Sequence, residues 1–308
     1  YFLVISLIFW TAIFGDLGVD MSIKKRLSEE DTDPHIVSSA LSLKMGLYLL
    51  VAGGILLATP VINDYVGAPV AKWLAAMLFV QLAVNFLMSV IDGQHKVHIS
   101  SLLSPVNWTF RSVFQIGLAA VGFGVAGLFT GYLVGGILTI SVGLYFAAVK
   151  VGLPTREDVT NLVSFAKYSW LGSLKGLSFR SMDTLILGLF VVNDLIGIYE
   201  IAWNLASLFA IFGSSVNRAI FPEISVSDGT VNEQVRNLVS ASFAYGGLFI
   251  IPGLIGSIIV GDVVLGIYGS EYVQGYQVLV ILTFSRLLHI YLGQLVTALN
   301  AIDRPEIS

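Results

Sequence analysis

Cysteine is absent from all 308 residues of this chain, so a disulfide framework, a thiolate metal site and a cysteine nucleophile are excluded. Charged residues are scarce as well, at 12% of the sequence against roughly 25% in soluble domains. The chain also lacks a Walker phosphate-binding motif, an HExxH zinc motif and a recognisable catalytic triad. We therefore expect a protein that is not an enzyme, with no metal, no cofactor and no nucleic acid partner.

Apolar residues dominate instead, since 56% of the chain is hydrophobic and the mean hydropathy is +0.85. They are grouped in long runs, and a membrane-spanning helix needs roughly 17 to 25 apolar residues in succession. Soluble core helices of this length rarely carry apolar side chains on all faces. We therefore predict an all-α fold, a polytopic membrane helical bundle with nine spans in this sequence. The spans are expected near residues 1–19, 36–58, 70–91, 100–121, 126–149, 166–191, 195–217, 237–260 and 276–299.

The distribution of basic residues supports this count. Cytoplasmic loops of membrane proteins carry an excess of Lys and Arg, which sets the orientation of the spans. One set of alternate loops holds ten of the 16 Lys and Arg residues, whereas the other set holds only Lys72. The first span is therefore expected to start outside and to end at the cytoplasmic face.

A weak internal repeat predicts two lobes. The Ala-Ile-Phe-Gly run at 12–15 recurs at 210–213, and the Ile-Asp pair at 91–92 recurs at 302–303. Both matches are offset by six spans, which suggests two pseudo-repeated six-helix lobes in parallel orientation. On this count one span precedes the sequence and at least two follow it. The expected parts are an N-terminal lobe at 1–149 with five visible spans, a cytoplasmic linker at 150–166 and a C-terminal lobe at 167–308 with four.

Five basic residues lie inside the predicted spans: Lys44, Arg111, Lys175, Arg180 and Arg286. A charge near the bilayer centre costs about 2.5 to 3.5 kcal/mol on insertion scales, so these residues must face water, a partner or an anionic ligand. By helix rise, Arg180 is about 20 Å from the inner end of its span, and Arg286 is about 15 Å from the outer end. Lys44, Lys175 and Arg111 are shallower, so they either line a cavity or snorkel to headgroups.

Only two carboxylates, Asp183 and Glu200, lie as deep as these cations. Each is a candidate for binding a coupling proton or sodium ion, or else the structural counter-ion of a nearby cation, as Asp183 is for Arg180 at i+3. The excess of cations predicts an electropositive cavity, which suits a phosphate or pyrophosphate because Arg and Lys are its usual partners. We expect Arg286 and Arg180 to hold the phosphate and the other three cations to attract it from the cytoplasmic side.

Several short motifs point to a known family. The run MDTLILG at 182–188 is followed by Gly-Ile-Tyr at 197–199. Asp-Leu-Gly lies at 16–18, Phe-Pro-Glu-Ile-Ser at 221–225 and Tyr-Gly-x-x-Tyr at 268–272. Together they resemble the polysaccharide flippase family of the multidrug, oligosaccharidyl-lipid and polysaccharide exporter superfamily. The resemblance covers nearly the whole chain.

The resemblance implies a flippase that moves a polyprenyl phosphate or pyrophosphate oligosaccharide from the cytoplasmic to the outer leaflet by alternating access. Its partners would be this lipid-linked substrate, membrane lipid and a proton or sodium gradient, in the cytoplasmic membrane of a prokaryote. The alternative is a cation-coupled multidrug or metabolite antiporter of the same superfamily, in which Asp183 and Glu200 would be essential. A membrane glycosyltransferase or polymerase would need a long outer loop for its site, and the outer loops here are short.

Overall fold

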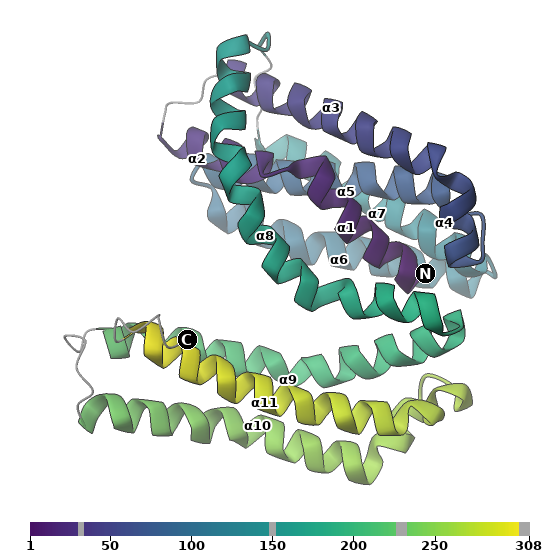
Figure 1. Ribbon diagram of the computed structural model, residues 1–308, viewed down its shortest axis with the longest axis vertical. Coiled ribbons are helices and arrows are strands. Elements are labelled where there is room, and N and C mark those ends of the chain that lie inside the picture. Colours follow the sequence, from purple (N-terminus) through teal and green to yellow (C-terminus); the bar gives the residue numbers. More distant parts are fainter. Residues whose placement is uncertain (30–33, 148–151, 226–232, 302–308) are drawn as a thin grey trace. The chain divides into compact units, whose positions relative to one another are not determined.

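The computed structural model describes residues 1–29, 34–147, 152–225 and 233–301 (Figure 1). These residues form eleven α-helices and one short 3-10 helix, η1, and the described part contains no strand. The chain divides into two compact units, Tyr1–Val191 and Val192–Ser308. Unit 1 contains α1 (Phe2–Asp16), α2 (Val19–Glu29), α3 (Pro34–Leu57), α4 (Thr59–Val66), α5 (Ala71–Gly93), α6 (Val97–Ala120), α7 (Gly124–Ala147) and α8 (Arg156–Phe190). Unit 2 contains α9 (Asn193–Ser225), α10 (Glu233–Gly266), η1 (Ser270–Gly275) and α11 (Tyr276–Ala301).

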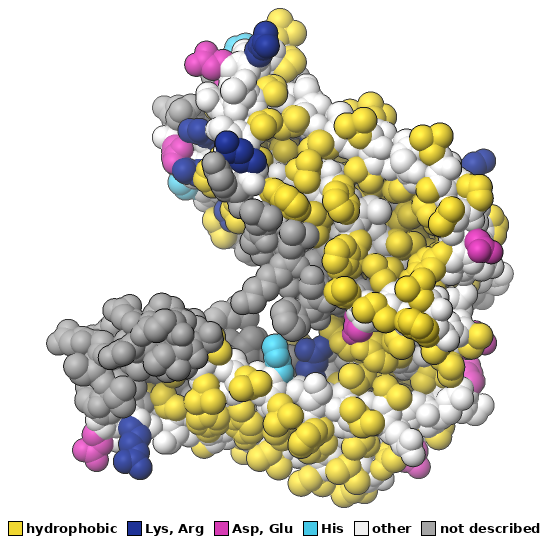
Figure 2. Space-filling view, in the orientation of Figure 1, with side chains coloured by type: hydrophobic (Ala, Val, Ile, Leu, Met, Phe, Trp, Pro, Cys, Tyr) yellow, Lys and Arg dark blue, Asp and Glu magenta, His cyan; other side chains and the backbone are white. Residues whose placement is uncertain are grey.

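The all-α prediction is confirmed, and each of the nine expected spans falls on a helix. In the described residues five helical stretches are long and apolar enough to cross a membrane, and α1 with α2 makes a sixth if that bent pair is one span. The expected span on α6 does not meet both conditions, and those on α8 and α9 include residues whose side chains the structure does not describe, so nine crossings and two six-helix lobes stay a prediction. Hydrophobic side chains cover much of the visible face of the helices in Figure 2, as expected for surfaces that meet lipid.

Helix α5 is the central helix of unit 1. It is apolar on nearly all faces, and it packs against α1, α2, α3, α6 and α7. The Asn63 side chain in α4 caps its start, because Asn63 Oδ1 accepts hydrogen bonds from the backbone N–H groups of Val70 and Ala71 at 2.8 and 3.0 Å. The burial of α5 means that polar groups on it must find partners inside the unit.

Helix α8 also belongs to unit 1, where it packs against α1, α2 and α3. Its first turn is fixed by Thr155, whose Oγ1 accepts a hydrogen bond from the backbone N–H of Asp158 at 3.1 Å. Residues 156–166, which the sequence analysis placed in a linker, are thus the first turns of a helix. The units divide after Val191, and the lobe boundaries expected from the sequence stay a prediction.

The chain bends by 52° between α1 and α2. Leu17 and Gly18 there have left-handed φ angles of 43° and 86°. Asp16 stabilises the bend, since its two carboxylate oxygens each accept a hydrogen bond of 3.1 Å from the backbone N–H groups of Gly18 and Asp20. Asp16 therefore ends one helix and caps the next.

Close packing of α6 on α7 depends on glycines spaced four residues apart on α7. A Cβ added at Gly135 would lie 2.5 Å from the backbone nitrogen of Arg111, and one added at Gly131 would lie 2.6 Å from that of Gln115. Small residues with this spacing let the backbones of two membrane helices approach each other. The arrangement places Arg111 directly against α7.

We predict that Gly135→Ala destabilises unit 1, because the clash is with backbone atoms that cannot rotate away. Overpacking of this kind costs about 1 to 3 kcal/mol, which outweighs the helix propensity gained with alanine. The measurement is the melting temperature of the purified protein in detergent. Gly117→Ala on α6 is the matched control, since nothing lies within 4 Å of its added Cβ, and an equal effect of both changes would contradict the prediction.

Unit 2 is built on the packing of α9, α10 and α11 against one another. Its core includes Ala202 and Ala206 of α9, Leu265 of α10 and Leu279 of α11, all buried. The small side chains on α9 let α11 lie close to it. This contact brings Arg286 of α11 to Trp203 of α9.

Candidate functional site

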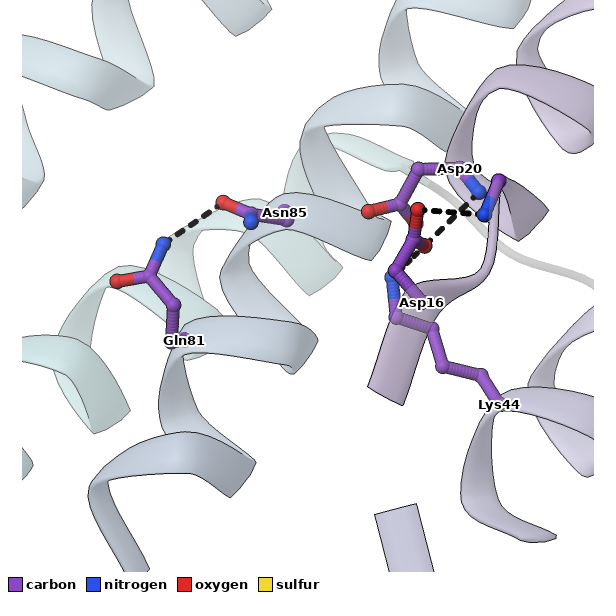
Figure 3. Close-up of polar contacts among 6 residues, drawn as sticks. Asp16, Asp20, Lys44, Gln81 and Asn85 are labelled. Atoms are coloured by element: carbon purple, nitrogen blue, oxygen red, sulfur yellow. Dashed lines mark hydrogen bonds and ion pairs between the residues drawn. The ribbon is translucent and has the colours of Figure 1, made fainter. Parts of the chain in front are cut away.

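Lys44 forms a buried triad with Asp16 and Asp20 (Figure 3). Its side-chain Nζ donates a hydrogen bond to Asp16 Oδ1 at 3.0 Å and a second one to Asp20 Oδ1. Lys44 is only 4% exposed, so the ammonium does not reach headgroups and the snorkelling interpretation does not describe this structure. Two carboxylates on one ammonium leave the triad with one excess negative charge when all three groups are ionised. We call these residues the Lys44 triad.

A cavity of about 290 Å³ lies beside Lys44. Its walls come from α3, α5 and α7, and they include Leu41, Met45, Phe79 and Leu144. Apart from Lys44 and Tyr48, the lining side chains are apolar. An oligosaccharide would lose its hydrogen bonds to water in such a cavity, so the cavity is suited to hydrocarbon rather than to sugar.

Arg111 of α6 is buried between two aromatic rings. Its guanidinium carbon lies 3.6 Å from the ring centre of Tyr132 in α7 and 5.4 Å from that of Trp108 in α6. The residue is 8% exposed, and its Nε atom is buried without a hydrogen-bond partner. In the part of the chain that the structure describes, no carboxylate forms an ion pair with it. We call Arg111, Trp108 and Tyr132 the Arg111 cage.

A chain of hydrogen bonds fixes Tyr132. Its hydroxyl donates to Gln81 Oε1 at 2.6 Å, and Gln81 Nε2 donates to Asn85 Oδ1 at 3.0 Å, both amides lying on α5. Beside Arg111, Thr139 Oγ1 donates to Asn107 Oδ1 at 3.3 Å. Tyr132 therefore has little freedom to rotate away from the guanidinium.

These amides are not among the site residues predicted from the sequence. A signal was present, because Gln81 and Asn85 are four residues apart on an otherwise apolar helix, as are Asn107 and Arg111. Residues at this spacing share one helix face. Each polar face is opposite a partner helix, which only the packing of α5, α6 and α7 makes visible.

Arg286 of unit 2 lies about 10 residues into α11, or roughly 15 Å from its start at Tyr276. Its guanidinium carbon is 4.5 Å from the ring centre of Trp203. Glu200 lies on the same helix as Trp203, one turn earlier, whereas Asp183 lies on α8 in unit 1. The two expected coupling carboxylates are thus in different units.

The side chains of Arg180 and Lys175 are outside the described residues, and only their place in α8 is known. Of the expected cations, the structure places Lys44 and Arg111 in unit 1 and Arg286 in unit 2. It joins Lys44 to two carboxylates and Arg111 to two rings. Whether any of these residues binds phosphate stays a prediction.

Comparison with known sequences decides the family, because a sequence model described as polysaccharide biosynthesis protein matches residues 1–276. The chain belongs to the polysaccharide biosynthesis protein family. This confirms the resemblance seen in the short motifs. It also agrees with a multi-pass membrane protein, as the apolar helices require.

Two curated relatives of this polysaccharide biosynthesis protein come from Haloferax volcanii. The chain is 31% identical to "Probable flippase AglR", over 98% of its own length and 64% of the relative's. It is 28% identical to "Probable low-salt glycan biosynthesis flippase Agl15", over 97% of its own length and 65% of the relative's. The chain therefore spans slightly less than two thirds of each of these proteins.

Two solved structures of MATE share the fold. A crystal structure of MATE in complex with MaD5 has a TM-score of 0.54 and 16% identity, covering 99% of this chain and 74% of MATE. The crystal structure of a MATE mutant has a TM-score of 0.52 and 16% identity, covering 98% of this chain and 73% of the mutant. At this identity the similarity shows a MATE-like fold and carries no information on substrate.

Proposed function

We propose that this polysaccharide biosynthesis protein is the larger part of a flippase. Its substrate would be an oligosaccharide linked to a polyprenyl phosphate or pyrophosphate, moved from the cytoplasmic to the outer leaflet by alternating access. The names of the two Haloferax volcanii relatives support this class of substrate. The single observation that carries the proposal is the buried guanidinium of Arg111, held by aromatic rings and not by a carboxylate in the described residues.

The argument from Arg111 is electrostatic. A charge inside a membrane protein is costly unless it is paired, and an aromatic face offsets only part of that cost. Stacking on a ring leaves the in-plane N–H groups of a guanidinium for other partners, and these groups match two oxygens of a phosphate. An anionic ligand would therefore complete the Arg111 cage.

The other predicted site residues have less central roles in this proposal. Arg286, Arg180 and Lys175 would bind the phosphate along its path. Lys44 already has two carboxylate partners, so it would have to leave Asp16 or Asp20 to bind an anion. Asp183 and Glu200 remain candidates for a coupling proton or sodium ion.

The proposed architecture follows the sequence prediction of nine spans in two six-helix lobes, in the cytoplasmic membrane of a prokaryote. We propose transport without catalysis, since a flippase changes the position of its substrate and no bond in it. A polar glycan needs a wet path through the bilayer, whereas its polyprenyl chain can remain in lipid. Alternating access between the lobes supplies such a path.

Reconstitution tests the function. The full-length protein in liposomes is expected to move a fluorescent glycosyl polyprenyl phosphate between leaflets, and protein-free liposomes are not. The assay follows quenching of the label by a reagent outside the vesicles. Uptake or efflux of small organic cations driven by a proton or sodium gradient, without lipid movement, would favour the antiporter and overturn the flippase proposal.

A further inference from the structure

Trp108 occupies an unusual place for a tryptophan on a predicted membrane span. Tryptophan gathers at the two interfaces of a bilayer, where its polar N–H meets water or headgroups. Trp108 instead lies halfway along α6, which runs from Val97 to Ala120, and 57% of it is exposed. An interfacial anchor would lie near either end of α6, so the aromatic belt does not account for this residue.

The neighbourhood of Trp108 offers another role. It precedes Arg111 by three residues, which puts both on one face of α6. The guanidinium carbon lies 5.4 Å from the Trp108 ring centre and packs more closely on Tyr132, at 3.6 Å. Arg111 is therefore buried against Tyr132, while more than half of Trp108 remains open beside it.

An indole face and a guanidinium edge side by side match the chemistry of a glycosyl phosphate. The C–H groups on one face of a sugar ring pack on an aromatic ring, and a phosphate accepts N–H groups of arginine. In a glycosyl phosphate the first sugar and the phosphate are joined through a single oxygen atom. The ligand groups are adjacent, as are the two side chains.

We propose that Trp108 and Arg111 form one subsite for the glycosyl phosphate end of the substrate. The indole of Trp108 stacks on the first sugar, and the guanidinium of Arg111 binds the phosphate attached to it. Tyr132, held by Gln81, is a positioning residue that keeps the guanidinium in place. The inference rests on the proposed function, and it adds the sugar contact and the residue that makes it.

The first experiment asks whether Trp108 meets water or lipid. The chain has no cysteine, so Trp108→Cys gives a single reactive thiol in it once any cysteine elsewhere in the full-length protein is replaced. We expect a charged thiol reagent to modify this position and a glycosyl polyprenyl phosphate to slow the reaction. Val113→Cys, also exposed and about 140° away around α6, serves for comparison and is expected to show no protection by the ligand.

The second experiment measures binding of three lipids to the full-length protein in nanodiscs: a polyprenol, its phosphate and its glycosyl phosphate. Arg111→Gln is expected to weaken the binding of the polyprenyl phosphate and of the glycosyl phosphate about tenfold, which is the effect of one charge-assisted contact. Trp108→Leu changes an exposed position, and it should weaken binding of the glycosyl phosphate only, by about threefold as expected for one aromatic contact.

Three results would overturn the subsite. In the first, the thiol at position 108 would react only with lipid-soluble reagents. In the second, the ligand would not protect this thiol. In the third, Trp108→Leu would weaken the binding of both phosphate-bearing lipids equally or of neither. Failure of the proposed function has a different signature, in which the unaltered protein binds the phosphates no better than the polyprenol. The two ideas can therefore be rejected separately.

Discussion

Replacing Lys44 by methionine is expected to destabilise unit 1 by about 3 to 5 kcal/mol, the usual cost of removing one partner from a buried ion pair. Methionine fills similar space, so the loss comes from charge and not from packing. Asp16 and Asp20 would then lie close together without a cation. Both side chains are mostly buried, at 26% and 17% exposure, and water screens their repulsion poorly.

The measurement is the melting temperature of the purified protein in detergent, compared with Lys72→Met. Lys72 is exposed near the start of α5, so its replacement removes the same charge without breaking a buried contact. Adding Asp20→Asn to Lys44→Met should restore part of the lost stability, because one unpaired carboxylate is then removed. Asp16 is retained in this double variant since it also caps α2. A Lys44→Met protein as stable as the unaltered one would show that the ion pairs of the Lys44 triad do not stabilise unit 1.

The Lys44 triad shows where sequence reasoning stops. Lys44 was predicted as a cation inside a span, and Asp16 was noted only as part of the Asp-Leu-Gly motif at 16–18. The sequence separations of Lys44 from the two aspartates are 28 and 24 residues, and no periodicity links residues that far apart. The pairing depends on the 52° bend at Leu17 and Gly18, which the apolar pattern of residues 1–19 does not reveal.

The helices themselves were predictable from the sequence. Backbone polar groups in lipid must be satisfied within a segment, so a long apolar run has little choice but to be helical. Residues 97–120 illustrate which contacts the apolar pattern does not predict. Their helix was expected, and Arg111 was expected either to line a cavity or to snorkel to headgroups, but the aromatic partner Tyr132 comes from α7. It reaches the guanidinium because Gly131 and Gly135 let the two backbones approach.

Replacing Arg286 by alanine is expected to abolish glycan display at the cell surface while the protein remains inserted in the membrane. The residue is roughly 15 Å from the start of α11, which on the predicted span corresponds to the middle of a bilayer core about 30 Å thick. Its contact with Trp203 is a cation–π interaction, which contributes about 0.5 to 2 kcal/mol and is too small to decide insertion. The larger loss would fall on binding of an anionic substrate, since a charge-assisted contact contributes about 1.5 to 3 kcal/mol.

The experiment complements a strain lacking the full-length protein and compares surface glycan with the amount of protein in the membrane. Arg236→Ala is the matched control in the same unit, because Arg236 is exposed near the start of α10. Normal display with Arg286→Ala would remove Arg286 from the proposed site. Arg286→Lys separates two explanations of a loss, since lysine keeps the charge but not the planar group over Trp203. Display with lysine would mean that charge alone is required, whereas its loss would mean that the phosphate is bound through the two-pronged geometry of a guanidinium.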